Sequence, residues 1–249
     1  MIRILLTNDD GLNAPGLVAM EQTLKAMPEV DLWVVAPDGE RSACSHSMTL
    51  NRPLFATKHG PQRLALSGTP VDCVYFAMFG YLPKKPHVVI SGINIGPNLG
   101  NDVIYSGTVA GAKEAVIRGV SGISVSQATG DNFEAVSKNA AKIALKTAQR
   151  EGDPILLNLN YPGPVFKGPK PAKLGVRIYP ELVEQRVAPV SKKKYYWLGG
   201  PPVQDRQIPG TDGHLIANGI ASATILTLEQ TCIKNTFAKV LSSLLKEKQ

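Results

Sequence analysis

Ile2-Arg3-Ile4-Leu5-Leu6-Thr7, followed by Asn8-Asp9-Asp10-Gly11, is the most informative stretch of this chain. The apolar run predicts a short buried strand, and the four polar residues come directly after it. Two adjacent carboxylates at the end of a buried strand repel each other and are costly to desolvate, unless a cation lies between them. A hard divalent metal ion, which prefers oxygen ligands, would fill that role. Asn, Asp and Gly are also good turn residues, so an ordinary turn is the alternative interpretation.

Strand and helix patterns alternate through the first two-thirds of the chain. Short apolar runs predict further strands over 31–36, 87–91, 122–126 and 155–160. Apolar residues at helical spacing predict helices over 15–27, 106–119 and 132–150. Such alternation is typical of a parallel α/β sheet that is covered by helices on both faces.

Two other segments have a different character. Proline and glycine interrupt residues 50–83, which we expect to form a hairpin followed by a short helix over 72–79. Beyond Pro162, residues 174–180 and 184–197 are expected to form long antiparallel strands. A two-stranded ribbon has little core of its own, so we expect it to pack on another subunit. A return strand over 221–226 and a final helix over 235–246 complete the chain.

We therefore divide the chain into three parts. Residues 1–162 are expected to form the α/β core with the metal site, and residues 163–218 an extended β-hairpin segment for oligomerisation. Residues 219–249 are expected to return to the core as a strand and a helix.

Composition limits the classes of protein that this chain can belong to. Its 249 residues are 43% apolar, enough for one sizeable core. No stretch approaches the roughly 20 apolar residues of a membrane span, and no signal-peptide pattern follows Met1, so a cytoplasmic protein is expected. Three cysteines without a CxxC pair predict buried or half-buried free thiols.

The formal net charge is +7, which suits anionic ligands such as phosphates or nucleic acid. Lys192-Lys193-Lys194 precede Tyr195-Tyr196-Trp197, a combination that can bind single-stranded nucleic acid. A subunit contact is the interpretation that we favour for these aromatic residues.

Ligands of open parallel sheets bind beyond the carboxyl ends of the strands. Besides Asn8–Gly11, residues 37–43 and 91–100 fall at that edge, and both carry small oxygen-bearing side chains. For Ser42 or Asn94 alone, hydrogen bonding within a loop is the commoner role. Ser106-Gly107-Thr108 opens a helix, where free backbone N–H groups bind phosphate, although an ordinary helix cap is the simpler interpretation.

The sequence lacks the motifs of several enzyme classes. Gly92, Gly96 and Gly100 are spaced by four, unlike the dinucleotide-binding fingerprint Gly-x-Gly-x-x-Gly. Residues 107–114 resemble a P-loop only loosely, because no Lys-Ser or Lys-Thr follows at the required place. No Gly-x-Ser-x-Gly elbow supports a serine hydrolase.

Read together, these segments resemble the SurE (survival protein E) nucleotidase family over roughly residues 2–125. The motifs that carry the resemblance are Asn8–Gly11 with Ala14-Pro15-Gly16, Ala36-Pro37-Asp38 with Arg41–Leu50, Gly68–Val74, Ser91–Gly100 and Tyr105–Val109. The resemblance implies a Rossmann-like sheet, a swapped C-terminal extension, and a homodimer or homotetramer. It implies a metal-dependent phosphatase of nucleoside monophosphates, with Asp9, Asp10, Ser42 and Asn94 as metal ligands and Asn98, Ser106, Gly107 and Thr108 around the phosphate.

The resulting hypothesis is a nucleotidase that uses one Mg²⁺ or Mn²⁺ ion and a metal-activated water, with Asp9 or Asp10 accepting the water proton. Nucleoside 5′-monophosphates are the expected substrates, and 3′-monophosphates and short polyphosphate remain open. A phosphatase of the haloacid dehalogenase type is one alternative, although its Asp-x-Asp pattern is missing because Gly11 stands two residues after Asp9. A non-enzymatic nucleic-acid binder that uses residues 192–197 is the other.

Overall fold

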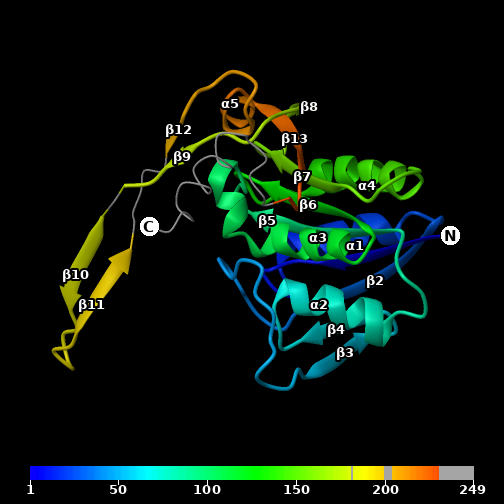
Figure 1. Ribbon diagram of the computed structural model, residues 1–249, viewed down its shortest axis with the longest axis horizontal. Coiled ribbons are helices and arrows are strands. Elements are labelled where there is room, and N and C mark those ends of the chain that lie inside the picture. The colour runs from blue at the N-terminus through cyan, green and yellow to red at the C-terminus, as the bar shows by residue number, and fades with distance from the viewer. Residues whose placement is uncertain (181, 199–203, 230–249) are drawn as a thin grey trace, which may run out of the picture.

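The computed structural model describes residues 1–180, 182–198 and 204–229, which form one mixed sheet with helices on both faces and a projecting hairpin (Figure 1). Within these residues no helix is long and apolar enough to cross a bilayer. The sheet with helices on both faces confirms the α/β class that the sequence predicts.

The main sheet has the strand order β3-β4-β2-β1-β5-β6-β7-β13-β8. Its centre is parallel and consists of β4 (Arg63–Leu66), β2 (Val30–Pro37), β1 (Ile2–Thr7), β5 (Val88–Ile95), β6 (Ser121–Gln127) and β7 (Leu156–Tyr161). At one edge β3 (Ala56–Gly60) runs antiparallel to β4. At the other edge β13 (Ile220–Leu226) runs antiparallel to β7 and parallel to β8 (Lys167–Pro171). All five strands expected for the core, and the return strand, are thus present.

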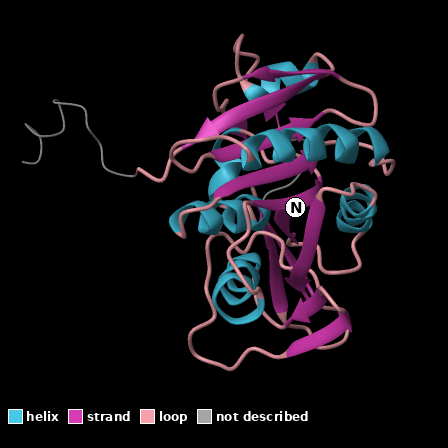
Figure 2. Ribbon diagram, turned by 90° about the vertical axis from the view of Figure 1, so that its right-hand side faces the viewer, coloured by secondary structure: helices cyan, strands magenta, loops and turns pink. Residues whose placement is uncertain are grey.

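Helices cover both faces of this sheet, as Figure 2 shows from the side. On one face α1 (Pro15–Lys25) packs beside α4 (Glu134–Ala148), and on the other α2 (Pro70–Phe76) packs beside α3 (Gly107–Ile117). A π-helix (Ala77–Tyr81), a 3-10 helix (Gly100–Ile104) and α5 (Asp212–Ala217) complete the helical elements of the described residues. The hairpin and short helix expected within 50–83 are confirmed as β3, β4 and α2.

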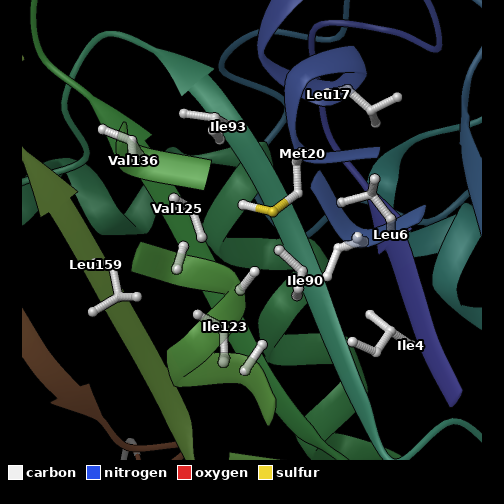
Figure 3. Close-up of a cluster of buried hydrophobic side chains, with 14 of the residues drawn as sticks. Ile4, Leu6, Leu17, Met20, Ile90, Ile93, Ile123, Val125, Val136 and Leu159 are labelled. Atoms are coloured by element: carbon white, nitrogen blue, oxygen red, sulfur yellow. The ribbon is translucent and has the colours of Figure 1, made fainter. Parts of the chain in front are cut away.

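The buried side chains follow the alternation of the strands. Ile4 and Leu6 of β1 lie in the core beneath α1 and α4, together with Met20, Ile90 and Ile123 (Figure 3). Leu5, between them, points to the opposite face and packs in a second core with α2 and α3. Because both faces of the central strands are buried, β1, β2 and β5 are largely apolar. That pattern made them visible in the sequence. β6 and β7, in contrast, alternate and place buried serine and asparagine side chains on one face.

The region beyond Pro162 differs in detail from the expected ribbon. The expected strand over 184–197 is wrong, because the chain turns back at 188–193 and forms the hairpin of β10 (Val183–Val187) and β11 (Lys194–Leu198). Of the expected strand over 174–180, only β9 (Arg177–Ile178) forms, paired with β12 (Gln204–Asp205). Pro189 cannot donate to a ladder, which favours the turn.

Two further expectations concern the end of the chain and the thiols. The expected helix over 235–246 and Cys232 lie outside the described residues. Cys73 is buried and Cys44 is half-buried, and both are free thiols, as predicted.

Candidate metal and phosphate site

In the loop after β1, two residues form the turn and the two aspartates take no part in it. Asn8 is fully buried, its Nδ2 donates to the Gly11 carbonyl at 2.9 Å, and its Oδ1 accepts from the Gly11 N–H at 3.2 Å. Asn8 and Gly11 therefore close the turn themselves. The side chains of Asp9 and Asp10 are not needed for the turn. An ordinary turn therefore explains Asn8 and Gly11 but not the two aspartates.

The surroundings of the two aspartates disfavour their charged forms. Asp9 is 4% exposed, and burial raises its pKa although a hydrogen bond from Thr108 opposes the shift. Burial and the neighbouring Asp9 raise the pKa of Asp10 to about 6. Asp10 Oδ2 is a buried acceptor without a hydrogen-bond partner. An unsatisfied buried carboxylate oxygen is costly, and a bound cation would remove that cost.

Two neighbouring side chains leave an oxygen available for such a cation. Asn94 donates through Nδ2 to the Gly96 carbonyl at 2.8 Å, so its Oδ1 is left as an acceptor. Ser42 donates its hydroxyl proton to Glu40 Oε1 at 2.8 Å, which leaves its oxygen lone pairs free. Together with Asp9 and Asp10 they offer only oxygen ligands, a set that fits Mg²⁺ or Mn²⁺.

Asn94 reaches the site because β5 is irregular at its carboxyl end. Ser91 pairs with Ser124 of β6 whereas Asn94 pairs with Ser126, so β5 carries one extra residue between them. A bulge of this kind re-aims the following side chain. Gly92 lies inside it at φ +135°, and a Cβ there would be 2.2 Å from the Val125 carbonyl oxygen, so no other residue fits.

The loop that carries Ser42 is tied down on its far side. Buried Asp72 at the start of α2 accepts hydrogen bonds from the backbone N–H and the hydroxyl of Thr49. Ser45 donates to the Ile104 carbonyl, and His46 Nε2 lies 2.9 Å from Glu114 Oε2. His46 is therefore a loop anchor rather than a group facing the aspartates.

Asn98 is held by the polar face of β6 and β7. Asn160 Oδ1 accepts from the Asn98 N–H at 2.8 Å, and Asn158 and Asn160 both donate to the Asn98 carbonyl. The Asn98 side chain donates to Ser126 Oγ at 2.8 Å. These buried contacts leave Asn98 little freedom to move.

The first turn of α3 faces the aspartates. Ser106 caps the helix by accepting from the Val109 N–H at 3.0 Å, so the cap interpretation is correct for this residue. The Thr108 hydroxyl donates to Asp9 Oδ1. A Cβ on Gly107 would lie 2.9 Å from Asp9 Oδ2 and 2.8 Å from Cys44 Sγ, so only glycine permits this close approach. The positive end of the helix dipole therefore lies against the carboxylates.

One cavity of about 230 Å³ unites these elements. All four predicted metal ligands line it, as do Asn98 and Ser106, whereas Gly107 and Thr108 stand directly behind Asp9. Among the described residues no group of three or more His, Cys, Asp or Glu could hold a metal, so a metal here would depend on the Ser42 and Asn94 oxygens. Sequence reasoning missed other lining residues, namely Ala43, Ile95, Asp102, Tyr105 and Tyr179.

Comparisons with known proteins identify the family of this chain. The model of the family described as "Survival protein SurE" matches residues 4–184. The 5′-nucleotidase SurE of Anaeromyxobacter dehalogenans (strain 2CP-1) is 43% identical over 236 residues, covering 92% of this chain and 91% of the relative. The 5′-nucleotidase SurE of Geotalea daltonii is 40% identical over 238 residues, covering 92% and 94%. The crystal structure of the Aquifex aeolicus SurE protein superposes with a TM-score of 0.82 at 36% identity, covering 98% of this chain and 100% of that chain.

Proposed function

Because this chain belongs to the SurE family and is an enzyme of its nucleotidase class, we propose that it hydrolyses nucleoside 5′-monophosphates to nucleoside and phosphate, with the aid of one divalent metal ion. The observation that carries the metal requirement is the orphaned, buried Asp10 Oδ2, which lies beside Asp9 in a cavity with oxygen ligands on its other walls. A buried pair of carboxylates without a cation would be destabilising.

The metal would be held by Asp9, Asp10, Ser42 and Asn94. When bound, Mg²⁺ or Mn²⁺ would supply Lewis-acid activation of the phosphate and of the attacking water. The chain itself contributes the orientation of these ligands: the Thr108 hydroxyl fixes Asp9, and the Gly96 carbonyl fixes Asn94. Asp9 or Asp10 would accept the water proton.

The phosphate would lie between Asn98 and the start of α3. The Ser106–Thr108 turn supplies positive potential there, and α3 is an 11-residue helix, long enough for a substantial dipole. Asn98 cannot swing away, because three hydrogen bonds hold its backbone and one holds its side chain. Preorganised groups of this kind stabilise charge that develops on the phosphoryl oxygens.

Phosphate release from a panel of nucleoside 5′- and 3′-monophosphates tests this proposal. We expect release from 5′-monophosphates with added Mn²⁺ or Mg²⁺, none with EDTA, and recovery when metal is restored. Metal binding by calorimetry to the EDTA-treated protein provides a readout that is independent of turnover. Full activity after exhaustive chelation would refute the metal requirement.

A second experiment separates this reaction from one with an aspartyl nucleophile. Acid quenching during turnover of a radiolabelled nucleoside monophosphate would retain label on Asp9 if that residue were phosphorylated. We expect no label on the protein, because direct attack by water forms no covalent intermediate.

We also propose that the β10–β11 hairpin is a subunit contact in a homodimer or homotetramer. Figure 1 shows it extending away from the sheet, and its apolar side chains are widely exposed, with Val183 at 60%, Trp197 at 59% and Leu198 at 81%. A lone two-stranded ribbon is marginal in water unless another surface covers it. Light scattering should give a mass of at least two chains, and a monomer at micromolar concentration would refute the proposal.

A further inference from the structure

The cavity is too small to enclose a nucleotide. Sites for small molecules usually measure about 300–1,000 Å³, whereas this cavity measures about 230 Å³. A phosphate and part of a sugar fill that space, so the rest of a nucleoside monophosphate must lie over the rim. Three large side chains that line the cavity are exposed there, namely Ile95 at 58%, Tyr105 at 62% and Tyr179 at 42%.

Asp102 also lines the cavity, but it does not belong with the aspartates of the β1 loop. It lies on the 3-10 helix Gly100–Ile104, whereas Asp9 and Asp10 follow β1. Its Oδ2 accepts from Arg177 Nη1 at 2.7 Å and from the Tyr179 hydroxyl. Its Oδ1 is buried and has no hydrogen-bond partner, so one acceptor remains to be satisfied.

The partners of Asp102 make it suitable for a neutral donor. Arg177 forms ion pairs with Asp102 and, at 3.3 Å, with Asp205, so the negative charge at the rim is partly neutralised. Burial and the contact with Asp102 raise the pKa of Tyr179 to about 12, so its hydroxyl stays protonated and donates. A carboxylate whose charge is already paired, and which has one free oxygen, is suited to accept a hydrogen bond from a hydroxyl group rather than to face another anion.

The segment that carries Tyr179 is clamped to the loop that carries Asp102. Buried Asp212 accepts from the Gly100 N–H at 2.9 Å and from the Gly175 N–H at 2.7 Å. The Arg177 N–H donates to Asn101 Oδ1 at 2.8 Å. The residues around β9 therefore form a fixed wall of the cavity, although they lie some 75 positions further along the chain.

We propose that Asp102, Tyr105 and Tyr179 form the nucleoside subsite of this enzyme. The free oxygen of Asp102 accepts a hydrogen bond from a ribose hydroxyl, and the two tyrosine rings provide contact area for the base. Aromatic faces stack on every base, so this subsite selects ribonucleoside monophosphates over small phosphate esters rather than one base over another. The inference rests on the proposed nucleotidase function and deepens it.

Wild-type enzyme and matched substrates test the subsite without any substitution. We expect kcat/KM to be about 10-fold lower for either the 2′-deoxy or the 3′-deoxy analogue of AMP than for AMP itself, because one charge-assisted hydrogen bond is lost. Equal values for all three substrates would overturn the ribose contact.

The variant Asp102→Asn tests the residue itself, with Asp153→Asn, a change at an exposed aspartate away from the cavity, as the matched control. We expect a KM for AMP about 10-fold higher, with kcat/KM for p-nitrophenyl phosphate changed by less than about 2-fold.

The corresponding pair of variants for the rim is Tyr179→Phe, with Tyr75→Phe as its control, since Tyr75 is 43% exposed elsewhere. Adenosine binding in EDTA, measured by calorimetry, should weaken in Asp102→Asn and stay unchanged in Asp153→Asn.

The outcomes separate this inference from the function on which it rests. An equal loss on AMP and p-nitrophenyl phosphate would mean that Asp102 only supports the fold, and would overturn the subsite while leaving the nucleotidase intact. No release from either substrate by the wild-type enzyme, with any divalent metal, would overturn both.

Discussion

Two sides of one cavity are built in different ways. Its acidic side consists of Asp9 and Asp10, in the loop that follows β1, and Asn94, at the carboxyl end of the neighbouring strand β5, so adjacent parallel strands bring those residues together. Its tyrosine side, Asp102, Tyr105 and Tyr179, depends on a segment 77 positions away in sequence that is docked by ion pairs and backbone contacts. The difference suggests that the chemistry depends on residues at the edge of the sheet and that substrate choice depends on the docked segment that carries Tyr179. A change on the acidic side should therefore affect all substrates, whereas a change on the tyrosine side should affect nucleotides alone.

The largest effect is expected for Asp10→Asn. This change removes the charge of a carboxylate whose buried Oδ2 has no hydrogen-bond partner, so we expect loss of metal binding and more than about a 100-fold fall in kcat on AMP and on p-nitrophenyl phosphate alike. Asp38→Asn, which changes an exposed aspartate paired with Arg41 in the next loop, is the control. Activity within a few-fold of wild type in Asp10→Asn would remove the acidic side from the mechanism.

Gly107→Ala should come next. The added Cβ would lie within 3 Å of Asp9 and Cys44, so the start of α3 must move away from the carboxylate. We expect kcat/KM to fall by about 10-fold to 100-fold on every substrate, because misplaced catalytic groups are costly. Gly60→Ala, where the nearest atom is 3.5 Å away, should behave like wild type. A loss confined to AMP would assign α3 to the tyrosine side instead.

Asn160→Ala is expected to have an intermediate effect. Asn160 makes two hydrogen bonds to the Asn98 backbone, and their loss leaves buried groups unpaired at a cost of about 1–3 kcal/mol. We expect KM to rise about 10-fold on all substrates, with a smaller change in kcat, if Asn98 binds phosphate.

Asn139→Ala, a change in α4, provides a matched comparison, because Asn139 binds Tyr161, the residue next to Asn160 on β7. It removes the acceptor of the buried Tyr161 hydroxyl, so it should lower stability without changing KM. If both variants lost stability and neither changed KM, Asn98 would not contact the substrate.

The same contrast explains what the sequence could predict. β1 and β5 were visible because buried parallel strands are largely apolar, and the carboxylates that follow β1 were conspicuous against that background. Ser42 and Asn94 are residue types that are common in loops, and the resemblance to the SurE family supplied them. No local pattern marks Tyr179, because its place at the cavity depends on the ion pair of Arg177 with Asp102, a contact between distant segments.

The turn at 188–193 was missed for a related reason. Residues 184–197 are rich in strand-forming side chains on both sides of it, and continuous strand propensity hides a reversal of the chain. Lys192 adopts φ 55°, a left-handed conformation that is uncommon for lysine and that the sequence does not announce.

The smallest effect is expected for Glu114→Gln, a change in α3 at the residue that contacts His46 of the Ser42 loop. Glu114 is 1% exposed, and burial raises its pKa, but hydrogen bonds from His46 and Arg118 outweigh that effect and hold the pKa below its usual value. A carboxyl whose pKa is lower in the folded state stabilises the fold above its unfolded-state pKa, and that stabilisation is lost as pH falls through the folded-state value. We therefore expect wild type to have a higher melting temperature than Glu114→Gln at pH 7, and the difference between the two melting temperatures to close below about pH 4.5.

Glu134→Gln, which breaks an exposed pair with Lys138, is the control and should shift the melting temperature little at any pH. A gap between wild type and Glu114→Gln that stayed constant from pH 7 to pH 3 would show that packing, not charge, holds His46 and the Ser42 loop in place.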